Sequence, residues 1–302
     1  MGRRTLVLAA LLLVVAAFAS AGCGERLEPL GELPSAYPVT ERGAGDQPVV
    51  VKARPERIVA LDPGSTELLL RLGVGGRLLG TPAEAPWRNA LKVVRLTGQI
   101  DVAAVARLRP DLVVATPSTD RVDLSRIERE TGATIYVQPA STIEEIERAA
   151  RELGFIVGEP VEARRLVAKL KRAAAAVDER LRSAPDVTVF IDTGFFITVP
   201  ERSLLGELVR RAHGKNVAAD NAGLGPFDLA QLRRLDPTVY LATSDSKTTL
   251  ETLRKNPKTR ALAAVREGHV IVLPAGLLSR AGPRIAKAYA DVARALHPDA
   301  FR

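Results

Sequence analysis

Reactive side chains are few in this 302-residue chain, which narrows the chemistry open to it. Its three histidines stand far apart and lack the i, i+4 spacing of a helical metal pair: His213, His269 and His297. No serine has a nucleophile-elbow pattern, since Ser65 lies in Gly-Ser-Thr-Glu and Ser279 in Leu-Ser-Arg. Cys23 is the only cysteine. We therefore expect no catalysis, no protein-built metal site and no disulfide.

Residues suited to ligand binding instead follow short apolar runs. Aromatic rings suit flat ligands, and an arginine suits bidentate recognition of a carboxylate. The first-turn N–H groups of a helix at residues 65 and 66 could receive an anion. Two alternatives stay open: one of the paired phenylalanines belongs to the core, and the arginine serves a structural ion pair. The candidates are Ser65, Thr66, Trp87, Thr116, Ser118, Phe195, Phe196, Phe227, Ser244, Lys247 and Arg280.

The elements that must position these residues alternate between strand and helix. The patterns predict strands at 57–61, 77–80, 112–115 and 134–137, with helices at 62–72, 101–108, 124–131 and 143–153. Such alternation indicates an α/β fold with mainly parallel sheets. A long helix at 161–182 interrupts it, with an apolar stripe through Leu166, Leu170, Val177 and Leu181. A strand at 187–191 follows, and the alternation resumes until a last helix near Leu296.

An internal repeat shows how these elements are organised. Residues 101–116 align without a gap on residues 228–243: each copy has an Asp N-cap, an apolar helix, a helix-ending proline and a strand ending in Ala-Thr. Two copies predict two similar lobes, whereas a solenoid needs three or more. Ligands of open α/β sheets bind beyond the carboxyl ends of strands, so Thr116 and Thr243 mark the mouths of the two lobes.

Composition excludes some partners. The formal charge is +8, and the basic residues are spread along the chain with acidic residues between them. Nucleic-acid binders usually cluster basic charge on one face and interleave stacking aromatics, but aromatic residues make up only 4% here. We therefore expect no nucleic-acid partner. An apolar content of 46% supports folded cores.

The first residues are typical of an export signal. Arg3 and Arg4 precede an apolar run over residues 6–19, and small residues lead to Cys23. A plain cleaved signal or an uncleaved anchor helix are the alternatives, although the run is short for a membrane span. The stretch is similar to that of bacterial lipoproteins, which implies removal of residues 1–22 and lipid on Cys23. Residues 23–50, rich in Pro and Gly, are expected to be a flexible tether.

Ordered motifs over residues 55–300 resemble the substrate-binding proteins of ABC importers for cobalamin, ferric siderophores and haem. The motifs are Leu-Asp-Pro-Gly-Ser-Thr-Glu at 61–67, Leu-Arg-Pro-Asp-Leu-Val at 108–113, Gly-Lys-Asn-Val at 214–217 and Arg-Ala-Gly-Pro-Arg-Ile at 280–285. The resemblance implies two Rossmann-like lobes, at 51–159 and 185–302, with a ligand cleft between them. One rigid helix, at 160–184, would link the lobes.

The same resemblance implies a monomeric receptor that takes a small molecule, either an iron chelate or a corrinoid. It would sit on the extracytoplasmic face, in the periplasm or held to the membrane by lipid, and deliver its ligand to an ABC permease. The cobalamin binder docks through a glutamate in each lobe, and Ala103 and Ala230 occupy those docking positions here. This departure motivates an alternative, an adaptor or sensor lipoprotein of the same fold without transporter docking.

Overall fold

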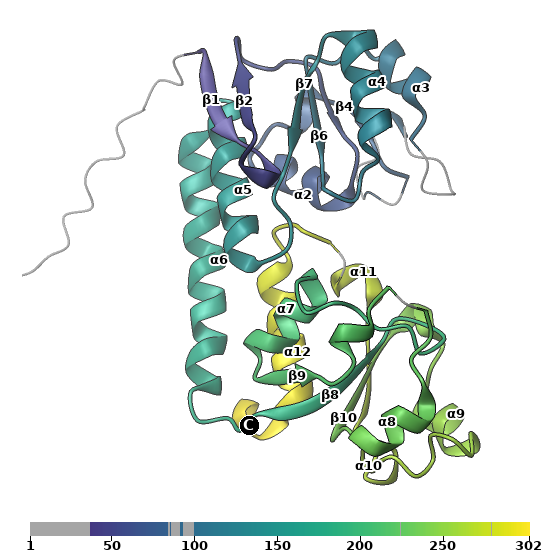
Figure 1. Cartoon of the computed structure of the whole chain (residues 1–302). Coiled ribbons are helices and arrows are strands. Elements are labelled where there is room, and N and C mark those ends of the chain that lie inside the picture. Colours follow the sequence, from purple (N-terminus) through teal and green to yellow (C-terminus); the bar gives the residue numbers. More distant parts are fainter. Residues whose placement is uncertain (1–36, 84, 86–90, 93–99, 224, 279) are drawn as a thin grey trace, which may run out of the picture. The chain divides into compact units, whose positions relative to one another are not determined.

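The computed structural model describes residues 37–83, 85, 91–92, 100–223, 225–278 and 280–302. Its N-terminal lobe is built on a five-stranded parallel sheet in the order β5-β4-β3-β6-β7 (Figure 1). The strands are β3 (Ile58–Ala60), β4 (Leu78–Thr81), β5 (Leu91–Lys92), β6 (Leu112–Ala115) and β7 (Thr134–Val137). Its helices are α2 (Pro63–Arg71), α3 (Val102–Arg107), α4 (Arg121–Thr131) and α5 (Ile143–Ile156).

The C-terminal lobe has a four-stranded parallel sheet in the order β11-β10-β8-β9. Its strands are β8 (Val187–Asp192), β9 (Gly214–Asn216), β10 (Val239–Thr243) and β11 (Val270–Leu273). Its helices are α7 (Leu204–Arg211), α8 (Leu229–Leu235), α9 (Leu250–Lys255), α10 (Ala263–Arg266), α11 (Ala275–Leu278) and α12 (Ile285–Leu296). The α/β class with two parallel sheets, predicted from the alternation of elements, is confirmed.

Local chemistry explains where the elements begin. Each of the helices α2, α3, α4 and α8 begins with an aspartate whose side chain accepts a hydrogen bond from a main-chain N–H of the first turn. These aspartates are Asp62, Asp101, Asp120 and Asp228 respectively. Such N-caps satisfy helix donors that have no partner within the helix. All four residues of β6 are buried, as expected for a parallel strand covered on both faces.

One long helix, α6 (Pro160–Leu181), packs against α5 of the N-terminal lobe and α12 of the C-terminal lobe (Figure 1). Pro160 begins it at a position where the missing N–H costs nothing. Of the predicted stripe, Leu170, Val177 and Leu181 are buried, and Leu166 is half-buried. The chain passes from one sheet to the other through this helix.

The expectation of a tether up to residue 50 was wrong for residues 37–50. Strands β1 (Val39–Arg42) and β2 (Pro48–Val51) form an antiparallel hairpin there. Val49 and Val51 are buried in the N-terminal core, and the Tyr37 hydroxyl donates a 2.8 Å hydrogen bond to the Ile156 carbonyl. These contacts come from distant parts of the chain, so the Pro- and Gly-rich local pattern hid them.

Cys23 and the leader lie outside the described residues, so the lipid site stays a prediction. Within the part of the chain that the structure describes, no helix is long and apolar enough to cross a membrane.

Candidate functional site

A cavity of about 530 Å³ is formed jointly by the two lobes at the carboxyl ends of their strands. The N-terminal wall comprises Asp62 and Gly64 after β3, Thr116 and Ser118 after β6, and Ser141 after β7. The C-terminal wall includes Leu204, Asp245, Gly276, Arg280 and Ala281. This is the edge at which open α/β sheets bind ligands, and the volume is in the range of small-molecule sites.

A second cavity adjoins the first along the N-terminal lobe. Its volume is about 520 Å³, and it shares Asp62, Thr116 and Ser118 with the first and extends to Asp123 and Arg126 on α4. The shared residues make the two cavities neighbours in one polar groove. The groove can therefore hold a ligand larger than the first cavity alone.

Arg280 is the cationic group of the first cavity. It is half-buried, and among the described residues no hydrogen bond or ion pair engages its guanidinium. Gly276 lies against it: a Cβ at that position would be 3.5 Å from Nη2 of Arg280. A partly desolvated guanidinium without a protein partner can take a ligand carboxylate with two parallel hydrogen bonds.

Asp62 supplies an acidic group on the facing wall. Its Oδ1 accepts a 2.8 Å hydrogen bond from the Ser65 main-chain N–H, and its Oδ2 accepts from the Ser65 hydroxyl. Burial raises the pKa of Asp62 to about 6, although the hydrogen bonds from Ser65 act in the opposite direction. The cleft therefore holds an acid that titrates close to neutral pH.

The structure brings together three of the residues predicted from the sequence. Thr116, Ser118 and Arg280 line one cavity, and the hydroxyl oxygens of Thr116 and Ser118 are 2.8 Å apart. These two hydroxyls and the guanidinium come from different lobes. They offer hydrogen bonding and positive charge to one bound molecule.

Two predicted contacts, Ser65 and Thr66, are contradicted. Both side chains are fully buried, and their main-chain N–H groups already bond to Asp62. The Thr66 hydroxyl donates to the Asp62 carbonyl at 2.9 Å. The helix start is therefore satisfied from within the chain, and neither residue presents a donor to the cleft.

The predicted aromatic contacts divide between core and surface. Phe227 is buried against Phe190, with ring centroids 5.7 Å apart, so its assignment to the ligand site is contradicted. Phe196 is half-buried against the same cluster. Phe195 is 85% exposed in the loop after β8. Trp87 lies outside the described residues.

Ser244 and Lys247 are exposed in the loop after β10, and neither lines the two cavities. The Ser244 hydroxyl accepts a 3.1 Å hydrogen bond from the Ala275 N–H and so ties that loop to α11. Sequence reasoning missed Asp62 and Asp245 as cleft residues. Asp62 lies two residues after β3, at a position where the sequence predicts only the start of the helix at 62–72.

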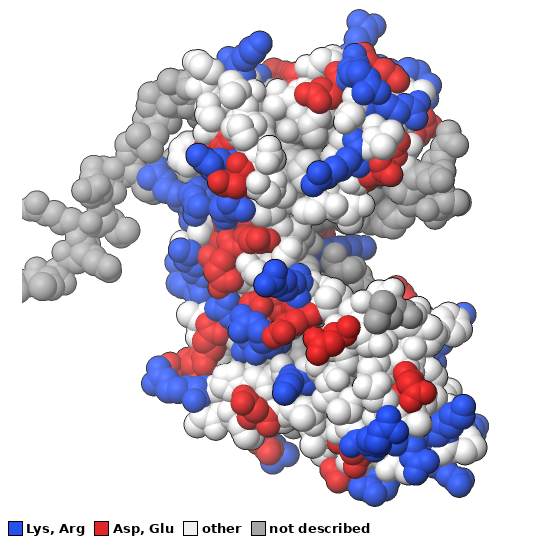
Figure 2. Space-filling model, viewed as in Figure 1, with Lys and Arg blue, Asp and Glu red and all other residues white. Residues whose placement is uncertain are grey.

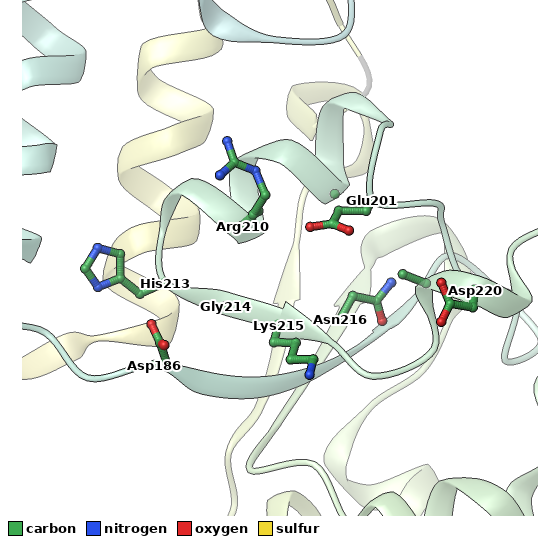
Figure 3. Close-up of a pocket in the computed structure, with 10 residues that line it drawn as sticks. Asp186, Glu201, Arg210, His213, Gly214, Lys215, Asn216 and Asp220 are labelled. Atoms are coloured by element: carbon green, nitrogen blue, oxygen red, sulfur yellow. The ribbon is translucent and has the colours of Figure 1, made fainter.

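Another cavity, of about 350 Å³, lies at the edge strand β9 and is a less suitable site. Its labelled side chains come from β9, from α7 and from the segments that flank them, and they are spread out instead of converging on one point (Figure 3). Arg210 is paired with Glu207 at 2.8 Å, and Nδ1 of His213 is 2.9 Å from the Ala184 carbonyl oxygen. These groups already have protein partners, which leaves little for a ligand.

Charge on the rest of the surface is mixed. Figure 2 shows Lys and Arg intermingled with Asp and Glu on the face viewed, with a dense basic group over the end of the C-terminal lobe where α8, α9 and α10 lie. Among the described residues, no three His, Asp or Glu side chains gather as metal ligands would.

A two-lobed α/β fold with a polar cleft at the strand ends defines a solute-binding class of protein. The model of the Periplasmic binding protein family matches residues 58–277, and the chain belongs to this family. Its members bind solutes and are not enzymes, which agrees with the absence of a catalytic constellation in the sequence.

The chain is also similar to individual proteins of known name or structure. The chain is 27% identical over 317 residues to an uncharacterized ABC transporter substrate-binding lipoprotein of Bacillus subtilis, YvrC, with 100% of both chains covered. The vitamin B12-binding protein BtuF of Vibrio cholerae has a similar fold, with TM-score 0.71, 21% identity, and 82% of this chain and 98% of that one covered. Helicobacter pylori CeuE as a Ni-His complex has TM-score 0.73, 16% identity, and 87% and 89% coverage.

Proposed function

We propose that this protein captures a metal-chelate nutrient in the cleft between its lobes and delivers it to an ABC importer. The observation that carries the proposal is the guanidinium of Arg280, which no described residue pairs, in a cavity formed by both lobes. Thr116 and Ser118 add neutral hydrogen-bonding groups on the opposite wall. A chelate bearing carboxylate or amide groups on its periphery matches this combination of charge and hydroxyls.

The distribution of metal-ligating side chains bears on which chelate binds. Haem iron in proteins usually takes an axial His, Tyr, Cys or Met. The only Cys is Cys23, the proposed lipid site, and the only Met is Met1, in the leader. All four tyrosine hydroxyls donate to groups within the protein, from Tyr37, Tyr136, Tyr240 and Tyr289.

The histidines do not line the cleft either. His297 is buried with Nε2 2.8 Å from the Ala212 carbonyl oxygen, and His213 lies beside β9. His269 precedes the amino end of β11, at the opposite edge of the sheet from the cavity. A ferric siderophore or a corrinoid, whose metal needs no protein ligand, therefore fits this chain better than haem.

We further propose that the protein works as a lipid-anchored monomer on the extracytoplasmic face of the membrane. The basic and apolar leader ending at Cys23 supports this, as does the lipoprotein named in Bacillus subtilis. Replacing Cys23 with Ser should release soluble protein from membranes. Unchanged membrane association of that variant would indicate an uncleaved anchor helix.

The permease would dock near the exposed Ala103 on α3 and Ala230 on α8. The neighbouring acids are committed to capping, because Asp101 accepts the Ala104 N–H at 3.0 Å and Asp228 accepts the Gln231 N–H at 2.6 Å. Capping leaves only part of their charge for a partner. The alternative of an adaptor or sensor that does not dock rests on these same alanines.

Native mass spectrometry tests the ligand class. The purified protein would be mixed separately with cyanocobalamin, a ferric tricatecholate siderophore and hemin. We expect one equivalent of one of the first two ligands, with binding lost in Arg280→Ala and kept in Arg260→Ala, an exposed arginine of the same lobe. Binding of hemin alone, or equal binding by both variants, would contradict the proposal.

A further inference from the structure

Asp192, the last residue of β8, is fully buried and accepts four hydrogen bonds. Its Oδ1 accepts from the main-chain N–H groups of Gly194 at 2.8 Å and Phe196 at 3.1 Å. Its Oδ2 accepts from the Tyr240 and Thr248 hydroxyls, each at 2.8 Å. A buried carboxylate is tolerated when it is fully hydrogen-bonded, and here both oxygens are shared between two donors.

The first pair of donors belongs to the loop after β8. Phe195 and Phe196 have φ angles of 54° and 59°, so two successive residues with side chains adopt the left-handed conformation that usually requires glycine. The loop is closed by the Ile197 N–H, which donates to the Gly194 carbonyl at 2.9 Å. Such a conformation persists only when its surroundings hold it. The result is that Phe195 stands 85% exposed.

The second pair of donors ties the loop after β10 to the same carboxylate. Tyr240 lies within β10, and Thr248 follows the turn that contains Lys247, whose φ is 57°. The Thr248 N–H also donates to the Ser246 hydroxyl at 3.1 Å. The two loops come close to each other, since a Cβ added at Gly194 would lie 3.7 Å from the Ser246 Cα. Asp245, in the same turn, lines the cavity with Arg280.

We infer that Asp192 is a positioning residue that fixes both loops of the C-terminal wall at once. One oxygen sets the loop that exposes Phe195, and the other sets the turn that places Asp245 on the cavity wall. That these loops serve a ligand rests on the proposed function. The clamp itself, meaning the four hydrogen bonds to Asp192, lies within the chain and can be tested without any ligand.

Three substitutions distinguish the contacts of Asp192 to the loop after β8 from its contacts to Tyr240 and Thr248. Asp192→Ala removes all four acceptor contacts. Asp192→Asn retains one carbonyl oxygen for the two N–H groups, and its NH₂ group meets hydroxyls that can also accept hydrogen bonds. Thr248→Val keeps the shape of the side chain and deletes only the contact to the second loop.

Hydrogen exchange followed by mass spectrometry on the full chain reads out each loop separately. In Asp192→Ala we expect exchange at residues 193–198 and 244–249 to accelerate roughly tenfold or more, because hydrogen bonds to a charged group are lost. Strands β10 and β11 should exchange as in the unaltered protein. Asp192→Asn should change 193–198 little, and Thr248→Val should accelerate only 244–249.

Uniform acceleration across β10 and β11 in Asp192→Ala would overturn the inference, because it indicates a general loss of core stability. Acceleration in only one loop, or an Asn variant indistinguishable from the Ala variant, would also overturn it. If Asp192→Ala does not fold, the Thr248→Val variant tests the inference instead. Unchanged exchange at residues 244–249 in that variant would refute the role of Asp192 in fixing the second loop. None of these results depends on whether a chelate binds, so failure of the proposed function is read separately.

Discussion

The side-chain amide of Gln138 donates a 2.8 Å hydrogen bond to the main-chain carbonyl of Ala281, 143 positions later in the chain. Gln138 follows β7 in the N-terminal lobe, and Ala281 follows Arg280 in the C-terminal lobe. Beside this contact, the Arg284 guanidinium donates to the Glu67 carboxylate, with Nε 2.9 Å from Oε2. The loop that carries the cleft arginine is therefore held by the opposite lobe.

Gly64 provides the first test of this interlobe contact. A Cβ there would lie 2.5 Å from the carbonyl oxygen and 2.7 Å from the carbonyl carbon of Ala281, both main-chain atoms that cannot turn aside. Gly64→Ala should lower the free energy of unfolding by about 1–3 kcal/mol. Gly76→Ala is the matched control, because no atom lies within 4 Å of its added Cβ. Equal melting temperatures for the two variants would show that the lobes do not meet as described.

Leu170 tests the packing of α6. It is buried on the face of the helix that meets the core, so Leu170→Ala should cost about 2–5 kcal/mol of unfolding free energy, measured by urea denaturation. Arg172→Ala, at an exposed position of the same helix, should change it by less than about 0.5 kcal/mol. A Leu170→Ala variant as stable as the control would exclude this packing.

Asp62 tests the electrostatics of the cleft. Its pKa is raised from 3.8 to about 6, so the folded state holds the proton more tightly than the unfolded state. The resulting stabilisation is complete below pH 3.8 and is lost as the pH rises through 6. Asp62→Asn, which remains a good N-cap, should therefore gain stability relative to the unaltered protein as the pH rises over this window. Urea midpoints would show this gain, and a pH-independent difference would contradict it.

The alanines at the docking positions allow a gain-of-function test. Ala103→Glu with Ala230→Glu should tighten binding to a permease that recognises glutamates, and the gain should shrink at high salt because exposed charge pairs are screened. Binding would be measured against detergent-solubilised permease at two salt concentrations. If affinity does not change, these are not docking positions, and the adaptor alternative loses its main support.

The fold was largely predictable because its signals are local. Aspartate caps and short buried apolar strands can be read within about ten residues, as at Asp101 and β6. The β1–β2 hairpin was not predictable in this way. Its anchor, the hydrogen bond from Tyr37 to Ile156, spans 119 positions.

The site was only partly predictable. Thr116 and Arg280 could be placed because they follow a predicted strand or belong to a recognised motif. Ser65 does not offer its donors to the cleft, because they bond to the neighbouring Asp62. Phe227 does not reach the cleft, because its ring packs against Phe190 in the core. The role of Asp192 depends on hydroxyl donors 48 and 56 positions away, which no local pattern reveals.

We propose that a chelate binds between the lobes through Arg280. Native mass spectra of the protein and its Arg280→Ala variant, each purified from the protein's own host, test it most directly. We predict one retained metal chelate per chain in the unaltered protein and none in the variant. Equal retention of the chelate by both proteins would contradict binding through Arg280. The absence of a bound molecule from both proteins would contradict it too, when the host has been grown with limiting iron and corrinoid and the ligand has then been resupplied.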